Sequence, residues 1–120
     1  MDKHNNDICK TNRRAVKDTL DVIGGKWKIL ILLTLKDKPY RFKELVNEIG
    51  ITSRMLSREL QDLEINKLIS REVLDTKPIG VEYSITKHGL TFQGVIEALR
   101  DWGLKHRNEI IWKTHVNMKR

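Results

Sequence analysis

Hydrophobic positions in the first third of the chain repeat at helical spacing. Between Asn12 and Ile23, apolar residues return every three or four positions among charged ones, which predicts an amphipathic helix. The segment 26–35 is apolar on nearly all sides, so periodicity alone does not separate helix from strand, but its length and leucine content favour a buried helix. A short extended piece at residues 40–42 then leads into a short helix over 43–49.

The next segment carries the signals of a helix start and of a buried stripe. Thr52 suits the N-cap of a helix that runs to about Asn66. Leu56, Leu60 and Leu63 follow at i, i+4 and i+7 and form its core stripe. Together with the helix before it, joined through a connection that contains glycine, this segment predicts a helix-turn-helix.

Beyond this pair the hydrophobic period changes from the helical to the strand value. Residues 69–74 and 81–85 alternate between apolar and polar side chains, and a loop with Pro78 and Gly80 joins them as a hairpin. Thr86 is expected to cap a last helix, whose apolar residues exceed what one small core needs. The element order predicts a mainly α fold with a small β-hairpin wing (α+β), the winged helix-turn-helix.

The charge of the chain is positive and concentrated. Lys and Arg number 23 against 16 Asp and Glu, a net charge of +7 that favours a polyanionic partner, either nucleic acid or an anionic membrane. Residues 26–58 hold eight basic and three acidic residues, so the charge gathers at the predicted helix pair. A membrane-binding helix would need an exposed apolar face beside its basic one. Double-stranded DNA is therefore the expected partner, and no membrane is expected.

The polar face of the helix that follows Thr52 offers hydrogen-bond donors and no acid. Arginine binds guanine through O6 and N7, glutamine pairs with adenine, and serine serves bases or phosphates. The expected base readers on this recognition helix, with Thr52 as their cap at the groove, are Ser53, Arg54, Ser57, Arg58 and Gln61. A solvated surface face is the alternative, but the element order and the local charge favour DNA.

Three further cations are placed to contact the DNA backbone. Arg41 and Lys43 stand at the start of the first helix of the pair, whose N-terminus faces phosphates in this motif. Lys77 is the basic residue at the hairpin tip and suits a phosphate or the minor groove. Simple solvation of a strand end and of a loop is the alternative for these side chains.

The composition argues against other classes of function. Cys9 is the only cysteine, so no internal disulfide is expected, and the histidines and acids show no metal-ligand or acid–base spacing. We expect no metal, no cofactor and no enzymatic activity. The N-terminus lacks an apolar secretory core, and the longest apolar run, residues 29–33, is too short to cross a bilayer. These features predict a cytoplasmic protein that acts at the nucleoid.

A set of short motifs distinguishes the chain. They are Gly24-Gly25-Lys26-Trp27, Arg41-Phe42-Lys43-Glu44-Leu45, Met55-Leu56, Val81-Glu82-Tyr83-Ser84-Ile85-Thr86 and Trp102-Gly103. In combination they closely resemble the HxlR-type transcriptional regulators, a branch of the MarR-like winged-helix proteins, over about residues 16–104. The resemblance implies a homodimeric bacterial DNA-binding regulator whose first and last helices build the dimer.

The resemblance also suggests how the chain is organised. We expect a flexible N-terminal arm over residues 1–11, an HxlR-type winged helix-turn-helix domain over 12–104, and a helical dimerisation tail over 105–120. The last helix then supplies the apolar residues of the dimer interface, which are Phe92, Ile96, Leu99 and Trp102.

Two positions depart from the family pattern. Many members carry a sensor cysteine where this chain has Arg14, and Cys9 lies five residues further out, so Cys9 is either a redox-sensing thiol or an inert exposed cysteine. Where the family commonly has a helix-ending glycine, this chain has Lys67. A left-handed backbone at a lysine would cost about 1 kcal/mol, so we expect Asn66 to take that conformation.

The sequence thus predicts a homodimeric, sequence-specific transcriptional regulator, and repression is the favoured mode of regulation. Its two recognition helices would enter successive major grooves of a pseudo-palindromic operator, about 34 Å apart. Two alternatives remain: a thiol- or electrophile-responsive sensor that acts through Cys9, and a winged-helix module that joins a larger protein assembly through its last helix. The sequence identifies no small-molecule or oxidant effector.

Overall fold

The computed structural model describes the backbone of residues 2–118 and the side chains of residues 6–112. Met1, Lys119 and Arg120, at the ends of the predicted arm and tail, lie outside the described residues. The chain divides into two compact units, and the boundary between them falls after Leu90. The first unit holds the helix-turn-helix and the hairpin, and the second holds the last helix.

The first helix begins earlier than the sequence predicts. Helix α1 spans Asp2–Ile23, so from Asp2 onward the residues assigned to the N-terminal arm (1–11) are part of this helix. The reason is local: no glycine or proline interrupts this stretch, and Ile8 extends the apolar positions of the helix seven residues ahead of Ala15. The hydroxyl of Thr11 also donates to the carbonyl oxygen of Asp7, four residues earlier, at 2.9 Å.

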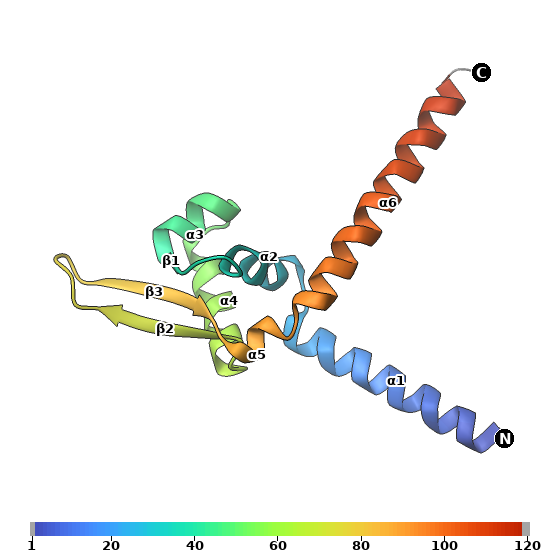
Figure 1. Cartoon of the computed structure of the whole chain (residues 1–120), viewed down its shortest axis with the longest axis horizontal. Coiled ribbons are helices and arrows are strands. Elements are labelled where there is room, and N and C mark those ends of the chain that lie inside the picture. The colour runs from blue at the N-terminus through green and yellow to red at the C-terminus, as the bar shows by residue number, and fades with distance from the viewer. Residues whose placement is uncertain (1, 119–120) are drawn as a thin grey trace. The chain divides into compact units, whose positions relative to one another are not determined.

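Three helices form the centre of the first unit (Figure 1). Helices α2 (Lys26–Leu35), α3 (Phe42–Ile49) and α4 (Ser53–Ile65) confirm the predicted segments, including the helical assignment of the apolar run. Helix α2 packs against both α3 and α4. The largest fully buried side chains all come from these helices: Ile31, Leu32, Leu35, Leu45, Leu56, Leu60 and Leu63.

A small antiparallel sheet completes this unit. Strands β1 (Tyr40–Arg41), β2 (Ile69–Leu74) and β3 (Gly80–Ile85) lie in the order β1-β3-β2. The β2–β3 hairpin projects from the helices as a long wing (Figure 1). The fold is therefore the predicted winged helix-turn-helix, mainly α with a small sheet.

The turn after α4 differs from the prediction. Lys67 adopts the left-handed conformation with φ 62°, whereas Asn66 has φ −84°. Two bonds close the helix end, because Leu68 N donates to the Leu63 carbonyl at 3.0 Å and Lys67 N donates to the Glu64 carbonyl at 2.9 Å. This double closure, the Schellman motif, requires the left-handed residue at Lys67, so the geometry of the turn overrides the preference of the side chain.

Replacing Lys67 with glycine should stabilise the protein by roughly 0.5 to 1 kcal/mol. Relief of the left-handed strain is worth about 1–2 kcal/mol, and the extra freedom of glycine in the unfolded chain offsets about 0.4–1 kcal/mol of it. Urea unfolding measures the difference. Asn66→Gly is the matched control, since Asn66 has an ordinary φ and should gain nothing; a gain at Asn66 and none at Lys67 would contradict the assigned turn.

The structure divides the predicted last helix into two helices, α5 and α6. Thr86 caps the short helix α5 (Lys87–Leu90), because its hydroxyl accepts a hydrogen bond from Gly89 N at 3.0 Å. Gly89 approaches the backbone of Leu68 so closely that a Cβ would lie 2.1 Å from the Leu68 carbonyl oxygen, which fixes α5 against the start of the wing.

A second helix then starts independently. Helix α6 (Gln93–Met118) begins where the Phe92 carbonyl accepts bonds from the backbone nitrogens of Val95 and Ile96, both at 3.1 Å. It continues without interruption past residue 104, so the predicted tail over 105–120 is, as far as Met118, the end of this helix.

Candidate nucleic-acid interface

The start of α4 has the predicted cap. Thr52 has an extended backbone, and its hydroxyl oxygen accepts a hydrogen bond from Met55 N at 3.2 Å. This bond satisfies one of the free backbone donors of the first turn. The first turn of α4 is thereby fixed while its outward side chains stay exposed.

The exposed face of α4 brings the predicted base readers together. Because Leu56, Leu60 and Leu63 are at most 1% exposed and turn inward, the opposite side of the helix faces solvent. The side chains exposed there are Ser53, Arg54, Ser57, Arg58 and Gln61, which we call the donor stripe. A shallow depression of about 220 Å³ opens beside it, lined by Thr52, Arg54, Met55 and Arg58.

Two of the three acids of α4 are paired with a lysine of α2, an interaction that the sequence analysis does not predict. Lys28 of α2 places its Nζ 2.6 Å from Glu59 Oε2 and 3.3 Å from Asp62 Oδ2. The side chains of Lys28 and Glu59 are only 11% and 13% exposed, whereas Asp62 is half exposed. The available signal is the position of Lys28, a single charged residue between Trp27 and the apolar run 29–33.

This ion pair also corrects the charge argument. Lys28 is one of the eight basic residues between positions 26 and 58, but its charge is neutralised by its ion pairs with Glu59 and Asp62. The positive charge available to a ligand therefore comes from the exposed cations of the helix-turn-helix, including Arg54 and Arg58.

The protonated state of Lys28 is stabilised by its partners. Burial acts to lower the pKa of Lys28, but the hydrogen bonds and negative charges of Glu59 and Asp62 outweigh it, and the net pKa is raised. A raised pKa in the folded state contributes stability that is fully present below the ordinary value of 10.5 and is lost as the pH rises through the raised value. The pair is thus intact at neutral pH.

The predicted backbone contacts at α3 are both exposed. Arg41 N donates to Glu44 Oε1 at 2.9 Å, which ties down the start of the helix. The Arg41 guanidinium lies against Gly80 at the start of β3, where an added Cβ would come 3.2 Å from Nη1. Lys43 is exposed on the first turn of α3. The structure thus joins Arg41 to the base of the wing and leaves Lys43 open to solvent.

The third predicted backbone contact lies in the wing loop. Lys77 is exposed between β2 and β3, in a loop that the Thr76 hydroxyl braces by donating to the Pro78 carbonyl at 2.8 Å. Ile79 beside it is 74% exposed, so the loop carries an apolar as well as a basic side chain.

The residues predicted at the dimer interface differ in their exposure. Leu99 and Trp102 are 49% and 66% exposed. The Trp102 ring stacks on the His106 ring, with 4.7 Å between the ring centroids. Phe92 is half-buried, and Ile96, at 4% exposed, offers almost no surface to a partner. Cys9 lies exposed on α1.

The described residues offer neither a membrane-spanning helix nor a metal-binding cluster. Among residues 2–118 no helix combines the length and apolarity needed to span a bilayer. Among residues 6–112, whose side chains the structure describes, there is no cluster of three or more His, Cys, Asp or Glu side chains that could hold a metal ion.

The comparisons with known proteins agree with this geometry. A model of the HxlR-like helix-turn-helix family matches residues 22–110. An HTH-type transcriptional regulator of Halalkalibacterium halodurans, BH0655, is 45% identical over 92 residues, which make up 75% of this chain and 81% of the relative.

Solved structures extend the agreement to the fold. The HTH-type regulator YtcD of Bacillus subtilis superposes with a TM-score of 0.74 at 39% identity, covering 78% of this chain and 96% of that one. The redox regulator HypR in its reduced form also gives a TM-score of 0.74, at 38% identity, covering 80% of this chain and 96% of that one. The chain belongs to the HxlR-like helix-turn-helix family of transcriptional regulators.

Proposed function

We propose that this regulator binds a pseudo-palindromic DNA operator as a homodimer and represses transcription by occluding the promoter. The observation that carries the proposal is the donor stripe, an exposed row of arginine, serine and glutamine side chains on α4. The Lys28 ion pair supports it, because the positive charge of Lys28 offsets the nearby carboxylates Glu59 and Asp62, which would otherwise repel DNA phosphates.

The docking follows the general geometry of the helix-turn-helix. The N-terminal residues of α4 reach base edges in the major groove, and α3 crosses the backbone. Arg41 and Lys43 at the start of α3 then contact phosphates, and Lys77 contacts a phosphate or the minor groove beside the wing. The site of action is the chromosomal DNA in the cytoplasm.

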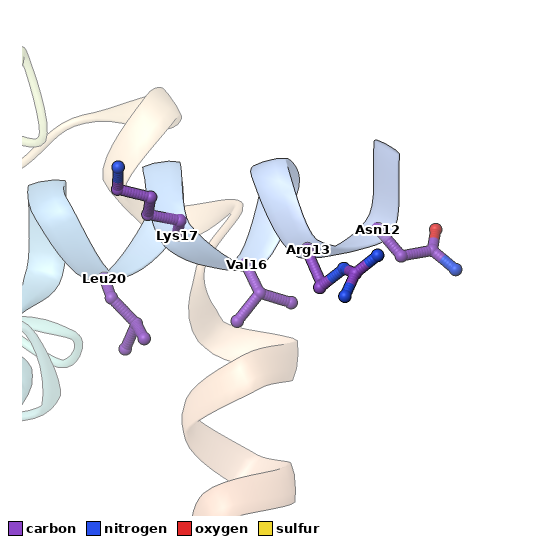
Figure 2. A pocket seen from close by; sticks show the side chains of 5 residues that line it. All are labelled: Asn12, Arg13, Val16, Lys17 and Leu20. Atoms are coloured by element: carbon purple, nitrogen blue, oxygen red, sulfur yellow. The ribbon is translucent and has the colours of Figure 1, made fainter. Parts of the chain in front are cut away.

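The proposed dimer is supported by the apolar surface on α1 and α6. On α1, Val16 and Leu20 are each 60% exposed and line a groove with Asn12, Arg13 and Lys17. Figure 2 shows Val16 and Leu20 pointing to the same side of the helix. On α6 the exposed apolar side chains are Val95, Leu99, Trp102, Leu104, Ile110, Ile111 and Trp112. Large exposed apolar side chains gathered on a helix, as on each of these two, are typical of a protein–protein interface.

Leu20→Asp should weaken dimerisation by at least about a hundredfold, because a two-fold interface would bury the new carboxylate twice. Light scattering during size exclusion reads the change from dimer to monomer. Thr11→Asp is the matched control, since Thr11 is exposed on the opposite side of α1 and outside the groove. A Leu20→Asp protein that remains dimeric would remove α1 from the proposed interface.

Selection of bound duplexes from a random DNA pool, at stated salt, tests the proposal as a whole. Enrichment of a sequence with two inverted half-sites supports an operator-binding homodimer. Failure to enrich any sequence above non-specific binding would reject it and favour the alternative of a module that joins a protein assembly through α6.

A second candidate function is a thiol-responsive regulator. It rests on the exposed thiol of Cys9 on α1 and on the similarity to HypR, which is described as a redox regulator. Because α1 is part of the proposed dimer, oxidation of Cys9 would act on the interface. Treatment with an oxidant should then change operator affinity in the natural chain and leave the Cys9→Ser variant unaffected.

A further inference from the structure

One apolar side chain stands exposed among the polar readers of α4. Met55 is 38% exposed, although the buried contacts of the helix are already made by Leu56, Leu60 and Leu63. Met55 lines the depression at the start of α4 together with Thr52, Arg54 and Arg58. The core therefore leaves a large part of the Met55 side chain available to a ligand.

The position of Met55 places it at the edge of the donor stripe. It precedes the inward Leu56 by one residue, so its side chain points about 100° away from the core direction. It lies three residues before Arg58 and next to Arg54, so one helical turn presents all three side chains together. The Thr52 hydroxyl fixes this turn through its bond to Met55 N. The N-terminal turn of a recognition helix is the part that contacts base edges.

We propose that Met55 reads the C5-methyl group of a thymine next to the base pair contacted by Arg58. The inference rests on the proposed function. The thymine methyl is the apolar group that the major groove displays, and a flexible, polarizable thioether packs well against it. Cytosine or adenine at this position would present an amino group that the methionine side chain leaves unpaired, at a desolvation cost. The preferred half-site therefore has thymine beside the base read by Arg58.

Deoxyuridine substitution tests this contact atom by atom. Each thymine of the selected operator is replaced in turn by deoxyuridine, which removes the methyl and leaves every hydrogen-bonding group in place. Wild-type protein should lose about fourfold in affinity at one position of each half-site, the effect of one buried methyl group. The Met55→Ala variant should bind the thymine and deoxyuridine operators equally, and Met55→Leu should retain a preference for thymine.

Ser57→Ala is the matched control on the opposite side of the donor stripe. It should weaken binding to both operators and keep their ratio unchanged. Circular dichroism checks that each variant is folded.

The outcomes separate this inference from the proposed function. If wild-type protein binds its selected operator but no deoxyuridine substitution changes the affinity, the Met55 contact is rejected and the operator-binding function stands. If Met55→Ala keeps the sensitivity to deoxyuridine, another side chain reads the methyl and the inference is again rejected. If wild-type protein selects no operator, the proposed function fails and the inference fails with it.

Discussion

Replacing Arg58 with alanine should weaken operator binding by roughly 10- to 100-fold and relax the preference for one base pair in each half-site. Arg58 is exposed in the donor stripe, three residues after Met55, where a guanidinium can bind guanine O6 and N7 with two hydrogen bonds. Loss of such a contact costs about 1–3 kcal/mol. Fluorescence anisotropy with the selected operator and its single-base variants gives both the affinity and the change in preference.

Lys77→Ala is the comparison for this result. A phosphate contact carries no sequence information, so this variant should bind all sequences more weakly by the same factor and show a smaller dependence of affinity on salt. If both variants bind the operator as the natural chain does, the DNA-binding face has been assigned incorrectly.

Replacing Lys28 with methionine should destabilise the protein by about 1–2 kcal/mol. The substitution leaves the largely covered Glu59 carboxylate beside α2 without its 2.6 Å partner, and because the pair is only partly buried the loss is smaller than the roughly 3–5 kcal/mol typical of a fully buried pair. Urea unfolding at neutral pH measures the loss. Because the folded-state pKa of Lys28 is raised, the difference from the natural chain should shrink only when the pH rises through that value, above 10.5.

Two controls isolate the ion pair. The double variant Lys28→Met with Glu59→Met should recover most of the lost stability, since Asp62 is half exposed and can be solvated. Lys36→Met changes an exposed lysine just after α2 and should alter the stability by less than about 0.5 kcal/mol. Equal losses for Lys28→Met and Lys36→Met would show that the pair does not stabilise the fold.

The elements that the sequence predicts well are those with local causes. The leucine spacing and the Thr52 cap define α4 without reference to any other segment, and the predicted cap bond is present. The alternation of residues 69–74 and 81–85 similarly predicts the hairpin. The donor stripe follows from the same periodicity, because fixing the buried face of a helix also fixes its exposed one.

The structure differs from the sequence predictions where segments distant in sequence are in contact, or where the hydrogen bonds of a turn determine the backbone conformation. Helix α5 lies against the start of the wing through the close approach of Gly89 to the backbone of Leu68, which is a tertiary contact. Lys28 pairs with a residue 31 positions away, so no local pattern reveals it. At Lys67 the side chain disfavours a left-handed backbone, but the two hydrogen bonds that close the helix end outweigh this preference.

The central claim, that paired α4 helices read two half-sites in successive major grooves, is tested most directly by changing the spacing of the selected operator. An insertion of five base pairs between the half-sites turns one of them about half a helical turn away from the other. Anisotropy titrations of the natural chain should show an affinity at least about 100-fold lower for the expanded operator, approaching that for random DNA. Equal affinity for the two operators would contradict the account.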